Sequence, residues 1–116
     1  MRRLTLAVLL LGALACKKDP PQPKKTSPDE MVAALKAAGL SAEKGSSIMA
    51  SVQNSELAFH LNVDGHDCPA YRFSSVEVAR DKGQSFEAGT SAGYWAFNCP
   101  ASARDTAQRM KTALEK

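Results

Sequence analysis

The chain has 116 residues, a formal net charge of +3 and a sequence pI of about 8.9. This length allows one small hydrophobic core and no more. The positive charge comes from Arg2, Arg3 and the lysines of segment 17–27, whereas residues 28–116 hold nine Lys and Arg against eleven Asp and Glu. Nine minus eleven leaves −2 on that part, so the high pI does not indicate a nucleic-acid binder.

The N-terminus has the pattern of an export signal. Arg2 and Arg3 precede twelve uncharged residues, 4–15, and Lys17 begins a polar stretch. Twelve residues are too few for a comfortable transmembrane helix, which takes roughly 17–25 residues. An N-terminal helix packed on a domain of this size would carry an apolar stripe instead of being apolar all round. The pattern therefore predicts a signal peptide over residues 1–15.

Two processing routes fit this signal. Ala13 and Ala15 match the small-x-small site of ordinary signal peptidase, which would leave a secreted protein with a free Cys16. The segment LGALAC, residues 11–16, resembles the lipobox of bacterial lipoproteins, except that Leu is commoner in that family where Ala13 stands. The resemblance implies that Cys16 receives a diacylglycerol, that cleavage follows Ala15, and that the new amine is often acylated too. Two or three acyl chains, palmitate for example, anchor a protein stably, so Cys16 is the expected lipidation site.

The residues after Cys16 predict the location of the protein and the start of its domain. In the enteric lipoprotein pattern an Asp after the cysteine retains the protein at the inner membrane, so Lys17 implies the outer membrane of the cell envelope. Residues 16–27 are rich in Pro and Lys, and we expect an extended tether that contributes no core. Removal of fifteen of the 116 residues leaves 101, and the predicted globular domain covers 28–116.

The first predicted element of the domain is a helix over 28–38. Ser27 can cap it, a proline and two acidic residues suit its first turn, and Gly39 can end it. Residues 40–47 have the composition of a loop. Residues 48–52 predict a short strand.

A hairpin follows. Residues 56–63 alternate between apolar and polar side chains, as in a half-buried strand, and Asp64-Gly65 is a strong turn signal. A two-residue turn would expose Tyr71 and Phe73. A three-residue turn over 64–66 puts the side chains of Tyr71 and Phe73 on the same face of the sheet as the apolar side chains of the first strand. The preferred register is the second one, because it buries two aromatic side chains.

The last third of the chain contains a helix, a strand and another helix. Residues 74–86 fit a helix with a capping box at its start, although a strand-turn-strand remains an alternative. Residues 89–93 predict a loop, and 94–99 a strand with its two aromatic side chains facing the core. Ser102 begins a final helix with an apolar face.

The predicted order is α-β-β-α-β-α, an α+β fold. It has a small antiparallel sheet of three strands, or four if 48–52 is one, with helices packed on it. This order, with Tyr71-Arg72-Phe73 and Trp95-Ala96-Phe97, resembles small uncharacterised bacterial lipoproteins in which a hairpin ends in a "YxF" strand. The resemblance implies a compact α+β domain and no particular chemistry. Arg72, between two aromatic residues, is expected to be exposed.

Two cysteines lie within the predicted domain. Two thiols in an exported domain usually form a disulfide, so we expect a bond between Cys68 and Cys99. A metal pair and two free thiols are the competing interpretations. Closing a loop of about thirty residues would stabilise the domain by roughly 3–4 kcal/mol.

Gly89-Thr90-Ser91-Ala92-Gly93 has the letters of a G-x-S-x-G nucleophile elbow. That elbow needs a strand before the serine, a helix after it and a large α/β sheet to hold the partners. A strand is predicted after the motif instead, so a flexible loop is expected and no catalytic residue is assigned.

One cluster in the hairpin has metal-ligand chemistry, formed by His60, His66, Asp67 and Cys68. Cys68 is already expected to pair with Cys99, so too few ligands remain, and neither a metal nor a cofactor is predicted. The favoured hypothesis is a non-enzymatic binding domain, tethered to the membrane, with an envelope protein or a small ligand as its partner. The alternative is a small metal-binding or enzymatic module that uses the His60/His66 hairpin.

Overall fold

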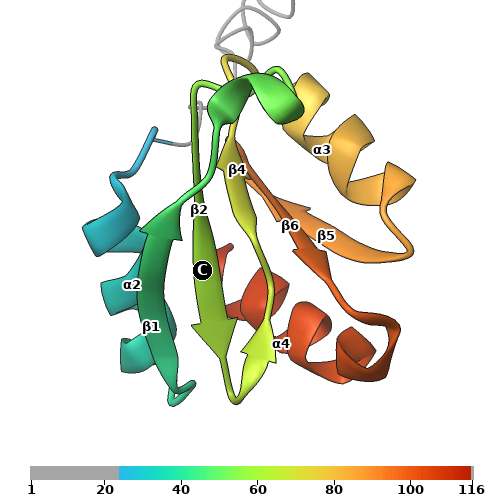
Figure 1. Cartoon of the computed structure of the whole chain (residues 1–116). Helices are drawn as coiled ribbons and strands as arrows, with labels where there is room; N and C mark the ends of the chain where they lie inside the picture. Colours follow the sequence, from blue (N-terminus) through green and yellow to red (C-terminus); the bar gives the residue numbers. More distant parts are fainter. Residues whose placement is uncertain (1–23, 116) are drawn as a thin grey trace, which may run out of the picture.

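The computed structural model describes residues 24–115, so the predicted signal peptide, Cys16 and Lys17 lie outside the described residues. Figure 1 shows the arrangement of the elements. In chain order the elements are α2 (Pro28–Ala37), β1 (Ala42–Ser47), the 3-10 helix η1 (Ala50–Val52), β2 (Leu57–Val63), β3 (His66–Asp67), β4 (Ala70–Arg72), α3 (Val76–Ser85), β5 (Ala88–Ala92), β6 (Trp95–Cys99), the 3-10 helix η2 (Ala101–Ala103) and α4 (Arg104–Leu114).

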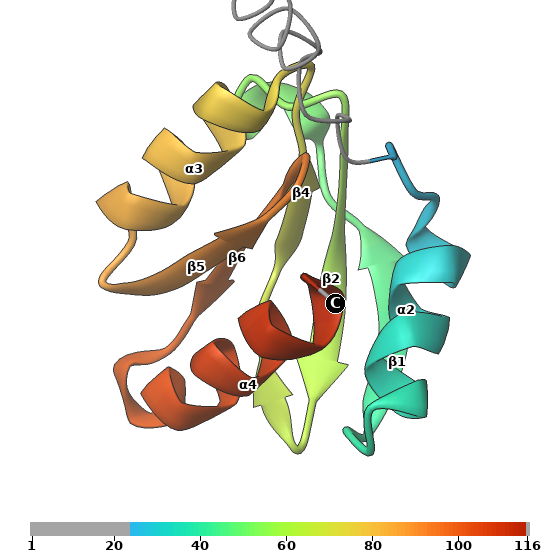
Figure 2. The same ribbon diagram turned by 180° about the vertical axis from the view of Figure 1, so that it is seen from behind.

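The strands form one antiparallel sheet of six strands in the order β1-β2-β4-β6-β5, with β3 paired to β2. Helices α2 and α4 pack on one face of the sheet, and α3 covers the β4-β6-β5 part of the other face (Figures 1 and 2). The predicted α+β class and the antiparallel sheet are confirmed. The strand number is larger than the three or four predicted.

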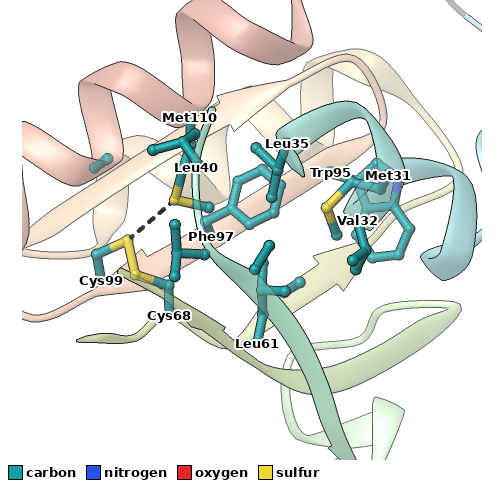
Figure 3. Close-up of a cluster of buried hydrophobic side chains, with 14 of the residues drawn as sticks. Met31, Val32, Leu35, Leu40, Leu61, Cys68, Trp95, Phe97, Cys99 and Met110 are labelled. Carbon is teal, nitrogen blue, oxygen red and sulfur yellow. Dashed lines mark hydrogen bonds between the residues drawn. A yellow bond between two sulfur atoms is a disulfide. The ribbon is translucent and has the colours of Figure 1, made fainter. Parts of the chain in front are cut away.

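The main core lies between the sheet and the helices α2 and α4 (Figure 3). The alternation of β2 puts Phe59, Leu61 and Val63 into it. Trp95 and Phe97 of β6 also face this core, as predicted. The helices add buried apolar side chains, the largest of which are Met31, Leu35 and Met110.

A second core lies under α3, and it explains why the predicted hairpin register is wrong. Asp64 and Gly65 form a two-residue turn with positive φ angles of 51° and 84°, which suit a tight hairpin. This register pairs Ala58 with Tyr71, so Tyr71 points away from the main core. Tyr71 and Phe73 are nevertheless buried, because α3 packs over them.

The three predicted helices are present. Ser27 and Glu30 form a capping box at the start of α2, where the Ser27 hydroxyl accepts from the Glu30 N–H at 3.1 Å. Helix α3 confirms the helical interpretation of 74–86, but its cap is Ser75, which accepts from the N–H of Val78. Helix α4 follows a 3-10 turn and buries Met110 on its inner face.

Two segments predicted as loops are edge strands of the sheet. In β1, which falls within 40–47, five of the six residues are exposed, so no alternation marks the strand. Strand β5 covers most of 89–93 and consists of small residues. Backbone pairing with β2 and β6 holds both strands in place, and such pairing leaves little trace in the side-chain pattern.

Residues 48–52, predicted as a strand, instead lead into the η1 turn. The carbonyl of Ala50 accepts from the N–H of Ser55 at 3.0 Å and from its hydroxyl at 3.1 Å. This local bonding closes the chain into a turn, in competition with strand pairing.

Two glycines set the close approach of α3 to β5. A Cβ on Gly83 would lie 2.7 Å from the carbonyl oxygen of Thr90, and a Cβ on Gly89 would overlap the carbonyl oxygen of Gly83. The glycine in the middle of α3, unfavourable for an isolated helix, is therefore required by packing.

Candidate functional site

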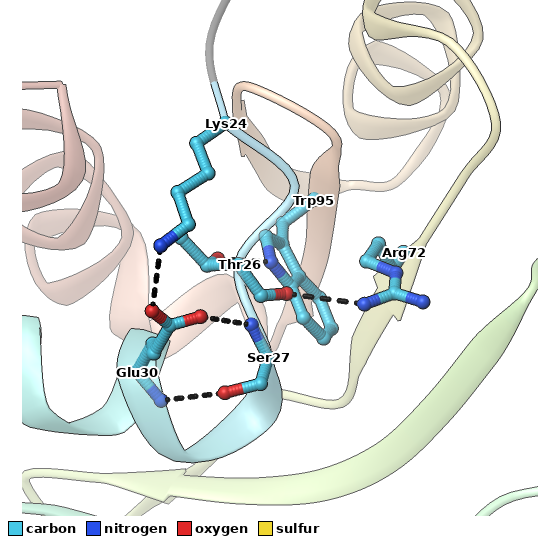
Figure 4. A network of polar contacts seen from close by, with 6 residues as sticks. All are labelled: Lys24, Thr26, Ser27, Glu30, Arg72 and Trp95. Carbon is cyan, nitrogen blue, oxygen red and sulfur yellow. Dashed lines mark hydrogen bonds and ion pairs between the residues drawn. The ribbon is translucent and has the colours of Figure 1, made fainter.

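The end of the predicted tether lies against the domain. The indole N–H of Trp95 donates to the hydroxyl of Thr26 at 2.9 Å, and Arg72 donates from Nη1 to the carbonyl of Thr26 at 3.2 Å (Figure 4). Trp95 is almost fully buried, so its N–H needs a partner inside the protein. Segment 24–27 thus covers the ends of β4 and β6, and we call this contact region the tether junction.

Glu56 links the tether junction to the start of β2. Lys25 Nζ lies 3.0 Å from one carboxylate oxygen of Glu56, and Arg72 Nε lies 3.4 Å from the other. The hydrogen bond from Lys25 lowers the pKa of Glu56, with the positive charges of Lys25 and Arg72 acting in the same direction. Arg72, expected to be exposed, is instead partly buried and serves as a bridge between Thr26 and Glu56.

A second carboxylate fixes the other side of the junction. The backbone N–H of Ser27 donates to Glu30 at 2.9 Å, and Lys24 Nζ lies 2.9 Å from the second oxygen of Glu30. The backbone hydrogen bond from Ser27 is the largest cause that lowers the pKa of Glu30, followed by the hydrogen bond from Lys24. The capping box of α2 therefore also holds the chain that enters the domain (Figure 4).

Beside the tether junction lies a groove of about 860 Å³, which we call the Trp95 groove. It runs between α2, the β5–β6 turn and the end of α4. Its apolar lining includes Met31, Trp95 and Leu114, while Glu30 and Glu115 add charge. Ligand sites typically measure about 300–1,000 Å³ and combine apolar walls with a few polar groups. Four further hollows that the described residues line measure about 210–260 Å³ each.

The strand register separates the two histidines of the hairpin. His60 and Asp67 lie on the face of β1 and β2 that α3 leaves uncovered, with His60 Nδ1 3.5 Å from Asp67 Oδ1. His66 pairs with Val63, so its side chain belongs to the opposite face. Cys68 is on that opposite face as well, buried in the main core. The sheet therefore does not bring the predicted His60/His66 pair together in one site.

The predicted disulfide is present. Cys68 and Cys99 are bonded, with their Cα atoms 4.2 Å apart, and both are buried. Met110 of α4 covers them, its Sδ 3.9 Å from Cys99 Sγ (Figure 3). This bond joins the β2–β4 hairpin region to the end of β6. It also means that Cys68 has no free thiol to offer as a metal ligand. Among residues 24–115, no group of three or more His, Cys, Asp and Glu side chains is placed to hold a metal ion.

The G-x-S-x-G letters belong to strand β5 and its turn. Ser91 pairs with Ala96 of β6, and its carbonyl accepts from Lys111 Nζ at 3.1 Å. A strand-to-helix turn, on which an elbow serine is exposed, does not occur at this position. The glycines of the motif serve packing and the hairpin turn instead.

In the part of the chain that the structure describes, no helix has the length and apolar character to cross a membrane. The chain matches no protein-family model, no curated protein and no solved structure.

The sequence predictions missed the tether junction and the Trp95 groove. The composition of 16–27 predicts an extended tether, and composition alone does not indicate that Lys25 and Thr26 contact the fold. Trp95 is the one sequence feature that points to the tether junction, because a buried indole N–H requires a hydrogen-bond acceptor from another part of the chain.

Proposed function

We propose that this chain is a bacterial cell-envelope lipoprotein. In this proposal residues 1–15 are removed, Cys16 carries the lipid, Lys17 directs the protein to the outer membrane, and the domain is a non-enzymatic binding module. The observation that carries the anchor is the apolar run 4–15 that leads into Cys16 in the segment LGALAC, and the tether junction, where Trp95 and Arg72 hold Thr26, supports its coupling to the domain. An anchor at Cys16 would then be coupled to a fixed place on the domain, next to a groove of ligand-binding size.

The Trp95 groove is the proposed binding surface. Its walls come from α2, β6 and α4, three elements that the main core holds together, so its shape is largely preformed. The partly exposed side chains of Tyr94 and Leu114 in the lining favour an apolar group of the partner. The charged side chains beside them would orient its polar part. We therefore infer a partner that inserts an apolar group, either a small amphiphile or a side chain of an envelope protein.

The positions of the other candidate groups also support a non-enzymatic role. Ser91 lies within a strand, Cys68 is bonded to Cys99, and the sheet lies between His60 and His66. Each of these residues is held in an arrangement that differs from the catalytic or metal geometry that its sequence motif would need.

The lipid anchor is tested by the intact mass of the protein extracted from membranes, with and without reductant. We expect a chain that begins at Cys16, carries two or three acyl groups and gains the mass of two hydrogen atoms when the reductant converts its disulfide to two thiols. The matched control is Cys16→Ser, which keeps the rest of the signal and cannot be acylated. An unacylated chain that starts at Cys16 would overturn the proposal.

The binding role is tested by site-specific photo-crosslinking in intact cells. A photoreactive amino acid replaces Ala34 or Leu114 in the groove, and a control replaces the exposed Asn62 on the uncovered sheet face. We expect one partner to be captured from both groove positions and not from position 62. Purified protein also reports ligands directly, because Trp95 is the single tryptophan of the chain and lines the groove. Capture from position 62 alone would place the binding surface elsewhere.

A further inference from the structure

The loop between β1 and β2 exposes two large apolar side chains. Met49 is 71% exposed and Val52 is 62% exposed, the highest values for large hydrophobic residues in the described part of the chain. Single exposed apolar side chains are common on protein surfaces, but these two lie three residues apart on one short turn. Residues 45–55 around them contain no charged residue. The loop is therefore an uncharged, partly apolar projection, which we call the Met49 loop (residues 48–55).

The Met49 loop lies at the end of the sheet where the chain enters the domain. It leads directly into Glu56, which pairs with Lys25. In Figures 1 and 2 the short helix of this loop and the start of the described chain lie at the same end, opposite the Asp64–Gly65 turn. Because Thr26 is held by Trp95 and Arg72, the exit point of the chain is fixed at this end.

The distance from the predicted anchor is short. The eight residue steps from Cys16 to Lys24 reach at most about 26–29 Å when fully extended. Strand β2 has seven residues and separates the two ends of the sheet by about 24 Å. Because the chain enters the domain at the end with the Met49 loop, the path from Cys16 to this end is shorter than the path to the Asp64–Gly65 turn by about the length of β2.

We propose that the Met49 loop contacts the bilayer that holds the lipid of Cys16, with Met49 and Val52 at the boundary between headgroups and acyl chains. The proposal rests on the proposed lipid anchor. Apolar side chains gain by leaving water at this boundary, and an uncharged loop brings no ion that would have to be desolvated. At the same end Lys24 and Lys25 are paired with Glu30 and Glu56, so these two carboxylates present no unpaired negative charge to anionic headgroups. The domain thereby has a fixed membrane-facing end, instead of moving freely on its anchor.

The test places a tryptophan reporter on each end of the acylated protein. Val52→Trp and Met49→Trp mark the loop, and Ala37→Trp, at the exposed far end of α2, is the matched control. Each acylated variant is reconstituted into phosphatidylethanolamine–phosphatidylglycerol vesicles with or without lipids brominated near the top of the acyl chains. The wild-type protein gives the fluorescence and quenching that Trp95 alone contributes, and this background is subtracted from each variant. We expect about twofold quenching of the two loop reporters, because interfacial side chains reach roughly 5–10 Å into the headgroup and acyl boundary. The control reporter should remain unquenched.

The outcomes separate this inference from the anchor itself. Acylated protein whose loop reporters are unquenched overturns the membrane contact and leaves the anchor intact, and equal quenching of the control overturns it too. A blue shift of the loop reporters that grows with protein concentration and needs no brominated lipid would show a contact between copies, which also overturns it. A chain found unacylated by mass overturns both proposals. If one of the two loop variants does not fold, the quenching of the other loop variant decides the test.

Discussion

Removing the hydroxyl of Thr26 isolates the contact that joins the tether to the fold. Thr26→Val keeps the shape of the side chain and deletes the acceptor of the Trp95 N–H, now 2.9 Å away. A buried donor left without a partner costs about 1–3 kcal/mol. Trp95 is only 3% exposed, whereas Thr26 is half-buried and admits some water. We therefore expect the free energy of unfolding to fall by about 1–2 kcal/mol.

The assay is urea unfolding of the purified protein, followed by circular dichroism, so that the signal does not depend on Trp95 itself. With a slope near 1–1.5 kcal/mol/M, the expected loss moves the midpoint down by about 1 M and leaves the slope unchanged. The matched control is Thr112→Val on α4, whose hydroxyl donates to the Gln108 carbonyl on an exposed helix face. The control should change stability by no more than about 0.5 kcal/mol. Equal effects of the two substitutions would refute the role given to Thr26.

Three further changes test other parts of the fold. Gly89→Ala should destabilise the domain by about 1–3 kcal/mol, because its Cβ would overlap the carbonyl oxygen of Gly83. Replacing both Cys68 and Cys99 by Ala should cost roughly 3–4 kcal/mol, since the bond closes a loop with a sequence separation of 31. The lowered pKa of Glu56 stabilises the fold above the pKa of the unfolded chain, and this stabilisation is lost as the pH falls through the folded pKa. In the Glu56→Gln variant the free energy of unfolding should therefore fall less steeply as the pH is lowered than in the wild type.

Each of these expectations has a control in urea unfolding curves. Gly45→Ala places a Cβ 3.2 Å from its nearest neighbour, so it should be milder than Gly89→Ala. Treatment of the wild type with reductant should lower stability, but it should leave the double Cys variant unchanged. Glu87→Gln, for which the described residues provide no ion pair, should keep the acid dependence of the wild type. An acid dependence that Glu56→Gln leaves unaltered would contradict the assigned ion pairs.

Helices and central strands could be predicted because the apolar side chains that face the core recur at the spacing typical of each element. The capping residue Ser27 and the alternation from Leu57 to Val63 are local, and both are confirmed. The register of the hairpin was wrong because it depended on a distant element. If only one face of the sheet were covered, the observed register would leave the Tyr71 side chain in water, which is unfavourable. Helix α3 removes this penalty because it forms a second core on the other face of the sheet.

The candidate site was harder to predict than the fold. The Cys68–Cys99 pair followed from chemistry alone, since an exported chain with two domain cysteines tends to form a disulfide. The tether junction depends on a contact between residues 69 positions apart, Thr26 and Trp95, and no periodicity marks it. The groove is formed by the ends of elements that the topology brings together, so no single segment carries its signal.

The depth of the disulfide constrains how the domain can mature. Cys68 is fully buried and Cys99 nearly so, beneath Met110 of α4. Once α4 has packed, the fold shields both sulfur atoms from a thiol oxidant in solution. We therefore expect the bond to form before α4 has packed over the two cysteines. A chain that packed α4 too early would hold two reduced cysteines out of reach until that helix opened again.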